Sequence, residues 1–273
     1  MNLPATPSAL TTLVKMPKKP KDANWSEPVV VIDRAQYQAD GQGFLKPQFR
    51  QIFVLPASGG TARQLTSGDF HYGSDLSFTP DSTALVFSAN LDPDWEFQPR
   101  DSNLYRLDLT SNELTALTTM PGDESAPVFS PDGKQLAFYR MDQGMVTDYP
   151  LVDVAPLPAK QNAIKYPMAG GKSHHVTVGV YNTATKQTTF LKTGEPAEKY
   201  LTNITWSPDE KHIYMAVLNR DQNHMWLYLY DLKGKLVRTL WEEKNDKWVE
   251  PEHPAFFPSK TSDNFIWISE KNG

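Results

Sequence analysis

Residues 206–219 read WSPDEKHIYMAVLN and hold the clearest structural signal in the chain. An aromatic residue, a proline and an aspartate lead into a run of β-branched and aromatic residues. Proline fixes φ at the first central position of a turn, and aspartate can accept a hydrogen bond from its own backbone two residues on. Short β-branched and aromatic runs bounded by turn residues are typical of strands. The stretch therefore predicts two strands that reverse tightly at Pro208 and Asp209.

The same reversal recurs along the chain as FTPD at 78–81, FSPD at 129–132 and, in degenerate form, FFP at 256–258. The four prolines are spaced by 51, 77 and 50 residues, so the middle interval carries roughly 25 extra residues. Similar strand-like runs follow each turn at comparable sequence distances, and most units contain three of these runs. The runs are 84–88, 103–108 and 113–117; 136–139, 176–182 and 187–191; 212–216, 226–231 and 236–240; and 264–268. Each unit is therefore predicted to hold four strands.

A four-strand antiparallel unit that repeats at this period predicts an all-β fold, a β-propeller with four-stranded blades. The alternative is a β-sandwich with coincidental turn motifs. A sandwich predicts evenly spaced strands but no four-strand period, so the repeat favours the propeller.

The two ends of the chain look like complementary parts of one blade. Residues 51–55 and 62–66 resemble the last two strands of a unit, and the residues after Pro258 resemble the first two. A blade shared between the termini would close the ring without free edges and give about four to five blade equivalents. The competing interpretation is a piece of a longer propeller, and the sequence leaves both open. We assign residues 1–24 to an N-terminal extension and 25–273 to the propeller.

Composition excludes several classes of protein. Of the 273 residues 39% are hydrophobic, which argues against whole-chain disorder, and the net charge of −5 argues against nucleic acid as a partner. Cysteine is absent, so disulfides and thiolate chemistry are excluded. No run approaches the ~18 to 20 apolar residues of a membrane span, so no membrane partner is expected. In the first 20 residues the lysines follow the apolar part, which is the wrong order for a secretory signal, and the localisation stays open between cytoplasm and periplasm.

The sequence contains no recognisable catalytic or metal-binding motif. The Gly-x-Ser-x-Gly nucleophile elbow of α/β-hydrolases does not occur, and the nearest string, residues 171–175, lacks the closing glycine and leads into a strand-like run. Ser173 is therefore not expected to act as a nucleophile. The histidines show no metal-ligand spacing, so we expect no metal and no cofactor. They stand at positions 71, 174, 175, 212, 224 and 253. The aromatic residues are expected to pack between blades rather than to stack on carbohydrate.

Several stretches resemble the propeller domains of the prolyl oligopeptidase family of serine peptidases. Residues 59–66 and 94–105 look most like acylaminoacyl-peptidase members, whereas the chain from about Leu136 onward looks like bacterial dipeptidyl peptidase IV. The second group of residues is 138–142, 148–152, 165–170, 174–179 and 219–223. The resemblance covers roughly residues 20–273. Because its character changes at a turn common to both subfamilies, we form the hypothesis of a chimera with a junction near 130–136.

The resemblance implies a role for the chain. In this family the peptidase activity belongs to an α/β-hydrolase domain that follows the propeller, and the propeller gates access of peptides to it. We therefore expect peptides to be partners through such a domain, and no hydrolysis by this chain alone. A stand-alone binding scaffold and a hydrolase with an unrecognised site are the alternatives. If blades are missing from the ring, unpaired strand edges favour a homo-oligomer.

Acidic residues are the candidates for substrate contact. Dipeptidyl peptidase members carry a paired-glutamate motif that binds the amino terminus of the substrate, and two carboxylates suit an ammonium group. This sequence departs from that pattern, because it has no equivalent insertion; Glu96 and Glu124 are the remaining candidates, and the only Glu-Glu pair, Glu242-Glu243, lies elsewhere. All four are expected to be solvated loop charges. The long insertion between Arg140 and His174 is expected to be a connection packed on a propeller face, with substrate access or subunit contact as the functional alternative.

Overall fold

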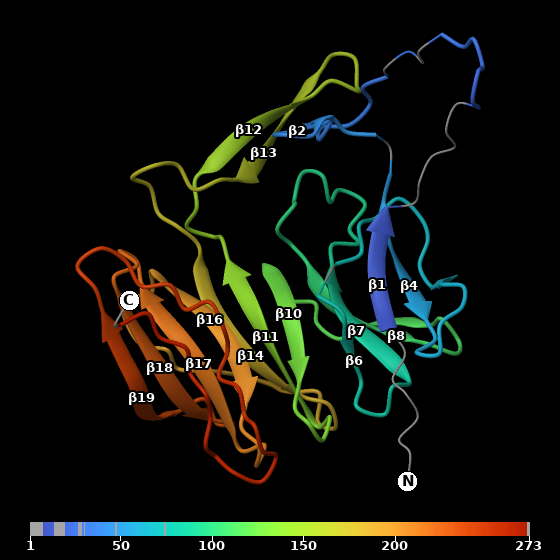
Figure 1. Cartoon of the computed structure of the whole chain (residues 1–273). Coiled ribbons are helices and arrows are strands. Elements are labelled where there is room, and N and C mark those ends of the chain that lie inside the picture. Colours follow the sequence, from blue (N-terminus) through green and yellow to red (C-terminus); the bar gives the residue numbers. More distant parts are fainter. Residues whose placement is uncertain are drawn as a thin grey trace.

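The computed structural model describes residues 8–13, 20–26, 29, 31–46, 48–73 and 75–271, and strands are the regular elements of these ranges (Figure 1). No helix that could cross a membrane occurs among these residues. The predicted all-β class is confirmed.

Three four-stranded antiparallel sheets follow one another along the chain, preceded by a three-stranded one, and we call these sheets the first to fourth blades (Figure 1). The strand order within each of the last three blades follows the sequence, apart from a hairpin inserted in the third. The first blade contains β1 (Ser8–Leu13), β4 (Arg50–Leu55) and β5 (Arg63–Gln64), and the second contains β6 (Ser77–Phe78), β7 (Ala84–Ala89), β8 (Asn103–Asp108) and β9 (Leu114–Ala116). The third contains β10 (Asp123–Phe129), β11 (Gln135–Asp142), β14 (His175–Asn182) and β15 (Thr188–Phe190), and the fourth contains β16 (Lys199–Trp206), β17 (His212–Asn219), β18 (His224–Asp231) and β19 (Leu236–Lys244).

The predicted proline-aspartate reversal joins the first two strands of each four-stranded blade. In the fourth blade the Ser207 hydroxyl donates to Oδ1 of Asp209 at 2.6 Å and accepts the backbone N–H of His212 at 3.0 Å, while Asp209 also accepts the N–H of Lys211 at 3.1 Å. The same three bonds recur at Ser130 in the third blade and at Thr79 in the second. The prediction is confirmed, and the hydroxyl before each proline completes the turn.

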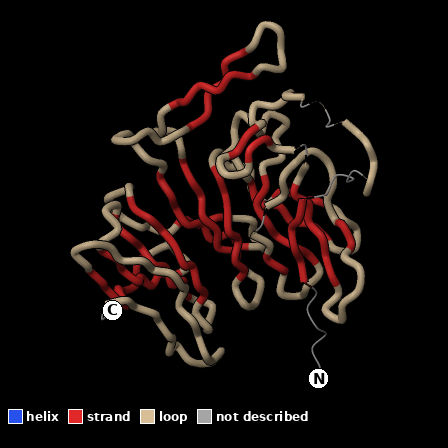
Figure 2. The backbone as a smooth tube through the Cα atoms, turned by 45° about the horizontal axis from the view of Figure 1, so that its top comes forward, coloured by secondary structure: helices blue, strands red, loops and turns tan. Residues whose placement is uncertain are grey.

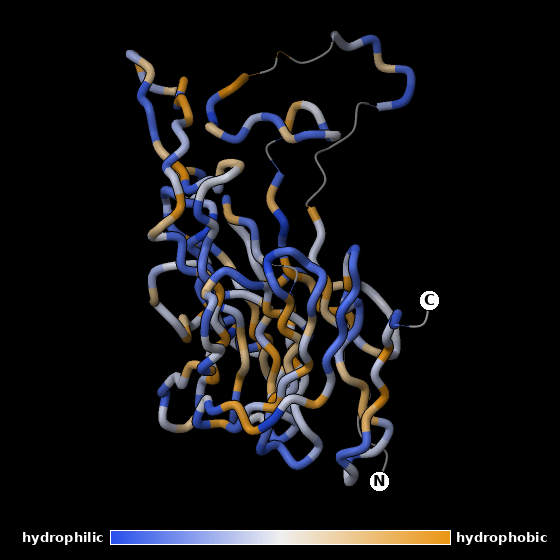
Figure 3. Tube along the Cα trace, turned by 90° about the vertical axis from the view of Figure 1, so that its left-hand side faces the viewer, coloured by the Kyte–Doolittle hydropathy of each residue, from blue (hydrophilic) through white to orange (hydrophobic). Residues whose placement is uncertain are grey.

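The second strand of each four-stranded blade contributes to two hydrophobic cores. In β7, Leu85 and Phe87 pack toward the first blade, whereas Val86 packs toward the third. The fourth blade repeats this pattern, with Ile213 facing the third blade and Tyr214 facing the C-terminal segment. Because alternate side chains of a strand point to opposite faces, a strand with a neighbour on both sides becomes continuously apolar. Hydrophobic residues accordingly gather in the interior of the row of blades (Figure 3).

Hydrogen bonds also connect neighbouring blades. The Trp206 indole N–H donates to the carbonyl oxygen of Val128 at 3.0 Å, and the backbone N–H of Ile204 donates to the Tyr139 hydroxyl at 3.3 Å. Between the same two blades, the N–H of Lys192 donates to the carbonyl oxygen of Gly234 at 2.8 Å. The third and fourth blades are thus fixed to one another by polar as well as apolar contacts.

Of the two possibilities that the sequence left open, a blade shared between the termini and a piece of a longer propeller, the shared blade is not formed by the described residues. Strands β4 and β5 take their third strand from β1, which lies inside the predicted N-terminal extension. The C-terminal segment pairs with itself at Phe256 and Ile266, and Phe257 packs against Tyr214 of the fourth blade with ring centroids 4.9 Å apart. Strand β1 and the described C-terminal segment lie at opposite ends of the row of blades (Figure 1). In β1 only Ala9 and Thr11 are half-buried, and Ala9 packs against the hydrophobic core of the first blade.

The 25 extra residues of the middle interval contain a separate hairpin, which we call the arm. It consists of β12 (Asp148–Asp153) and β13 (Lys160–Lys165), and it leaves the third blade between β11 and β14. Figures 1 and 2 show it standing away from the blades, so the expectation that it packs on a propeller face is wrong. We call the end of the blades from which it departs the arm face, and the end with the proline-aspartate turns the turn face. A smaller hairpin, β2 (Gln38–Ala39) with β3 (Gly43–Phe44), precedes β4.

Candidate functional site on the arm face

Glu124 lies in β10 on the arm face, with a fully buried side chain. Its Oε2 accepts the Thr118 hydroxyl at 3.1 Å, and its backbone N–H donates to the carbonyl oxygen of Ser102 at 2.8 Å. The Thr118 hydroxyl in turn accepts the backbone N–H of Leu104 at 2.9 Å. Glu124 therefore joins the third blade to the second.

Arg140 stands directly opposite Glu124 in the β10–β11 register. Its Nε is 3.6 Å from Oε1 of Glu124, and its Nη2 donates to the carbonyl oxygen of Pro121 at 2.8 Å. The guanidinium carbon lies 5.8 Å from the centre of the Phe190 ring, within reach of a cation–π interaction. Arg140 thus holds the β9–β10 connection as well as the carboxylate.

Burial is the largest cause of the pKa shifts of Glu124, Asp123 and His174. Removal from solvent raises the pKa of Glu124 to about 7, although the Thr118 hydroxyl and the Arg140 guanidinium oppose the shift. Burial also raises the pKa of the neighbouring Asp123, whose Oδ1 accepts the N–H of Ser102 at 3.3 Å. The pKa of His174, nearby on the same face, is lowered by burial and by the charges of Arg100 and Arg220. On the arm face, Glu124 therefore changes protonation near neutral pH.

Glu96 is placed in the loop between β7 and β8, where it binds the chain itself. Its Oε2 accepts the backbone N–H of Ala35 at 2.9 Å, and its Oε1 is 3.8 Å from Nη1 of Arg34. The side chain is only 16% exposed. Glu96 and Glu124 are thus engaged with different segments and do not form a paired carboxylate site.

The Glu242-Glu243 pair lies in β19, because that strand extends beyond the predicted 236–240 to Lys244. Glu242 points to solvent and meets Nε2 of His224 at 2.7 Å. Glu243 is buried and accepts the Ser269 hydroxyl at 2.6 Å and the Trp241 indole N–H at 3.1 Å. The expectation of solvated loop charges is therefore wrong for Glu124, Glu243 and Glu96, whose neighbours supply hydrogen bonds in place of water. Glu242 is solvated as expected, but it belongs to a strand.

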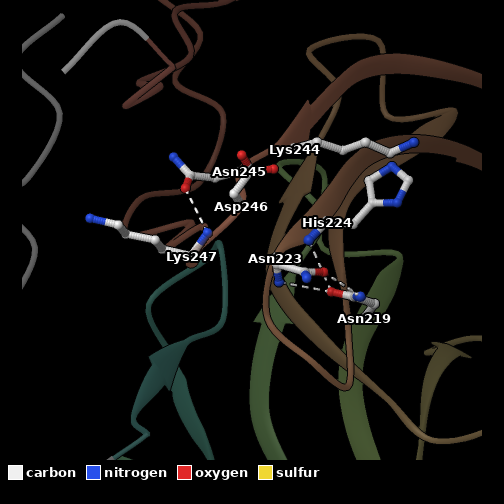
Figure 4. Close-up of a pocket in the computed structure, with 7 residues that line it drawn as sticks. All are labelled: Asn219, Asn223, His224, Lys244, Asn245, Asp246 and Lys247. Atoms are coloured by element: carbon white, nitrogen blue, oxygen red, sulfur yellow. Dashed lines mark hydrogen bonds between the residues drawn. The ribbon is translucent and has the colours of Figure 1, made fainter.

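An open polar groove of about 690 Å³ lies on the fourth blade beside these groups (Figure 4). The groove forms where the β17–β18 turn faces the end of β19, and Asn219 fixes that turn. Its Oδ1 accepts the backbone N–H groups of Asn223 at 3.0 Å and of His224 at 2.9 Å. The lining residues are Asn219, Asn223, His224, Lys244, Asn245, Asp246 and Lys247.

This groove was not predicted as a site from the sequence. Residues 219–223 are among those that carry the family resemblance, which is the signal that pointed to this turn. Their partner segment, 244–247, comes beside them only through the β18–β19 register, in which His224 faces Lys244. In the described part of the chain, no three His, Asp or Glu side chains are arranged to hold a metal ion.

The sequence model for the dipeptidyl peptidase IV (DPP IV) N-terminal region matches residues 24–128 and again 120–273. The probable dipeptidyl-aminopeptidase B of Phaeosphaeria nodorum is 26% identical over 224 residues, which is 68% of this chain and 23% of the relative. Dipeptidyl-aminopeptidase B of Aspergillus niger is 23% identical over 295 residues, which is 88% of this chain and 32% of the relative. The chain thus spans about a quarter to a third of these relatives.

Two solved structures share the fold of this chain. A Bacteroides ovatus protein assigned as a dipeptidyl aminopeptidase IV is 34% identical with a TM-score of 0.61, covering 82% of this chain and 31% of that one. Porphyromonas gingivalis dipeptidyl peptidase 4 is 20% identical with a TM-score of 0.61, covering 82% of this chain and 33% of that one. Both parts of the chain match one family, and the junction near 130–136 stays a hypothesis. The chain therefore belongs to the family of DPP IV N-terminal regions and is a propeller region of the prolyl oligopeptidase type.

Proposed function

We propose that this propeller region is a non-catalytic gate that controls the access of peptides to an α/β-hydrolase domain. The observation that carries the proposal is the match to the DPP IV N-terminal region across residues 24–273. Relatives of the matched family are named dipeptidyl-aminopeptidases. The peptide substrate class comes to this chain from those names and from the family resemblance.

The packing of the blades supports the gate. A size filter must keep its shape, because a wall that opens easily admits folded proteins as well as extended peptides. The third and fourth blades are fixed by the Trp206–Val128 and Ile204–Tyr139 hydrogen bonds and by a shared apolar core. Separating them would expose side chains that each contribute about 1.5–3 kcal/mol by burial.

The acidic candidates also fit a wall rather than a catalytic centre. Glu124 is buried and ion-paired, and Glu96 holds the backbone of residue 35, so each already has a partner within the chain. Ser173 leads into β14 and not into a helix, so it lacks the strand-to-helix elbow that exposes a hydrolase serine. We accordingly expect no turnover of chromogenic Xaa-Pro or acyl-amino-acid substrates by this chain alone.

A reconstitution experiment tests the gate. The purified chain is mixed with the part of the Bacteroides ovatus relative that follows the matched region, where the family resemblance places the hydrolase domain. Association is measured by sedimentation, and turnover is compared for a chromogenic dipeptide and for a folded protein substrate. The gate predicts association, with cleavage of the folded substrate suppressed relative to the dipeptide. Unchanged cleavage of both substrates in a mixture that associates would overturn it.

A binding scaffold is the second candidate, and the polar groove beside Asn219 and His224 favours it. A scaffold predicts no association with the hydrolase part in the same sedimentation experiment. Peptide binding by the chain alone would then be lost when Asn219, which fixes the groove turn, is replaced by alanine. The two candidates therefore give different results with the same two preparations.

A further inference from the structure

A second cavity, of about 340 Å³, lies on the turn face between the second and third blades, remote from the arm face. Its inner wall is apolar, since Val86 and Leu136 are fully buried and Tyr181 is 5% exposed. Leu117 and Phe129 line it as well, and the rim is charged. A hollow of this size with an apolar interior and a few polar groups has the build of a small-molecule site.

The acidic groups at the rim are already bound within their own turns. Asp81 accepts the Thr79 hydroxyl at 2.6 Å and the backbone N–H of Thr83 at 3.1 Å. Asp132 accepts the backbone N–H of Lys134 at 3.0 Å and pairs with its ammonium at 2.8 Å. These bonds lower the pKa of both carboxyl groups, so both stay ionised; the Lys134 ammonium offsets the charge of Asp132, whereas Asp81 keeps its charge and interacts electrostatically with Arg106.

The basic groups at the rim keep donors to spare. Nη2 of Arg106 reaches Oδ2 of Asp108 at 3.5 Å, while the other oxygen of Asp108 accepts the N–H groups of Thr110 and Ser111. Lys186 occupies the β14–β15 turn, where its backbone N–H donates to the carbonyl oxygen of Asn182 at 2.8 Å. Its ammonium makes no hydrogen bond or ion pair with the part of the chain that the structure describes. Two cations with unused donors therefore line the opening of an apolar hollow.

We propose that this cavity binds a small carboxylate with an aromatic or branched aliphatic body. The carboxylate lies at Arg106 and Lys186, and the body packs on Val86, Leu136 and Tyr181. Arginine offers a planar fork of donors that matches a carboxylate, and the apolar wall rewards a body that leaves water. Because the chain carries a net charge of −5, its overall charge does not attract an anion, and the attraction at this opening must come from Arg106 and Lys186 themselves. The chemistry fits a free N-acylated amino acid and equally the last residue of a peptide.

Four matched probes separate these possibilities. Binding of N-acetyl-phenylalanine to the full chain is measured by isothermal titration calorimetry, beside N-acetyl-phenylalanine amide, which has the same body without the charge. Ala-Ala-Phe and its amide test a peptide terminus in the same way. We expect at least one acid to bind, and its amide to bind roughly five- to tenfold more weakly, as loss of an ion pair at a partly exposed site predicts. Binding by the tripeptide alone identifies a peptide terminus, and binding by both acids identifies the free residue as sufficient.

Variants test whether the acid binds in this cavity. Lys186→Gln and Arg106→Gln should each weaken the acid about two- to fivefold. Lys233→Gln removes the same charge from the β18–β19 turn of the fourth blade and should leave binding unchanged. Leu117→Trp should fill the hollow and abolish binding, and the far-ultraviolet circular dichroism of each variant reports its folding. Equal affinity for acid and amide, no binding of either acid at 10 mM, or a Lys233→Gln effect as large as that of Lys186→Gln would each overturn the proposal.

Discussion

Gly133 lies against Pro80 of the preceding blade so closely that a Cβ atom on the glycine would stand 2.7 Å from Cγ of the proline ring. The two residues belong to successive copies of the same turn, so each reversal is shaped to accept its neighbour. Gly133 also has φ of +71°, a conformation that residues with a Cβ rarely adopt. Contact and conformation together require glycine at this position.

Gly133→Ala is expected to lower the free energy of unfolding by roughly 2–4 kcal/mol, through a clash with the ring and through left-handed strain. Urea denaturation measures the change. Gly194→Ala is the control, because Gly194 has a similar φ of +75° with nothing within 4 Å of its added Cβ. It should cost only the strain of about 1–2 kcal/mol. Equal losses in the two variants would show that the contact with Pro80 contributes nothing.

Stability should fall as the pH rises through the range in which Glu124 titrates. The pKa of Glu124 is about 7 in the folded chain against an ordinary 4.5, so the folded state binds more protons between these values. The stabilising effect of protonation is complete below about pH 4.5 and is lost by about pH 7, a change of about 1–3 kcal/mol. Urea unfolding at several pH values between 5 and 8 measures it.

Glu124→Gln is expected to flatten this pH dependence, because the amide does not titrate. All other titratable groups remain in both proteins, so the difference between the two curves isolates Glu124. Glu252→Gln changes an exposed carboxylate, 57% accessible, and should keep the wild-type slope. A Glu124→Gln curve parallel to the wild type would contradict the assignment.

Ser207→Ala should reduce stability by about 1–3 kcal/mol, because the buried turn loses a donor to Asp209 and leaves the N–H of His212 without its acceptor. Ser130→Ala removes the equivalent bonds of the third blade and should cost a similar amount. Thermal unfolding compares the two with Ser259→Ala, whose hydroxyl interaction with Thr261 lies at the surface. Losses of the same size in all three variants would remove the special role of the turn hydroxyl.

Self-association is expected through the first blade. Leu10 and Leu13 of β1 are 39% and 46% exposed, and in the described residues β1 pairs with β4 alone, which leaves its other edge free. Sedimentation should show association that depends on concentration, and a Leu10→Lys, Leu13→Lys variant should raise the dissociation constant roughly tenfold. Leu157→Lys on the arm, where the leucine is 98% exposed, is the control. A monomer at all concentrations, or weakening by the control alone, would contradict the prediction.

Local chemistry explains why the reversals at Pro80, Pro131 and Pro208 were predictable from the sequence. Each turn is complete within about six residues, so its signal survives without knowledge of the rest of the chain. The pairing of β1 was not predictable, because its partner β4 lies more than 35 residues further along the chain. Proline-rich sequence around β1 also concealed its strand character.

The surroundings of the site residues could not be predicted from the sequence either, because they depend on residues that are distant along the chain. Glu124 could be named from its acidic neighbourhood, but its partner Arg140 follows only from the β10–β11 register, which a bulge between Ser125 and Val128 shifts. The burial of Glu243 depends on Ser269, a residue in the segment that folds back onto the fourth blade. Charge alone cannot distinguish such a carboxylate from a solvated one, because burial is a property of the assembled blades.

Asp142 and His175 face one another across β11 and β14, although the whole arm separates them in sequence. The arm leaves the third blade after Asp142 and returns to it at His175, and these two residues are paired. The length and composition of the arm therefore do not affect the register between β11 and β14. The entropic cost of closing a loop rises only slowly with its length, and the pairing of Asp142 with His175 already holds the two ends of the arm together. The Asp142–His175 pair is accordingly a suitable grafting point, at which a different hairpin could replace the arm while the third blade keeps its geometry.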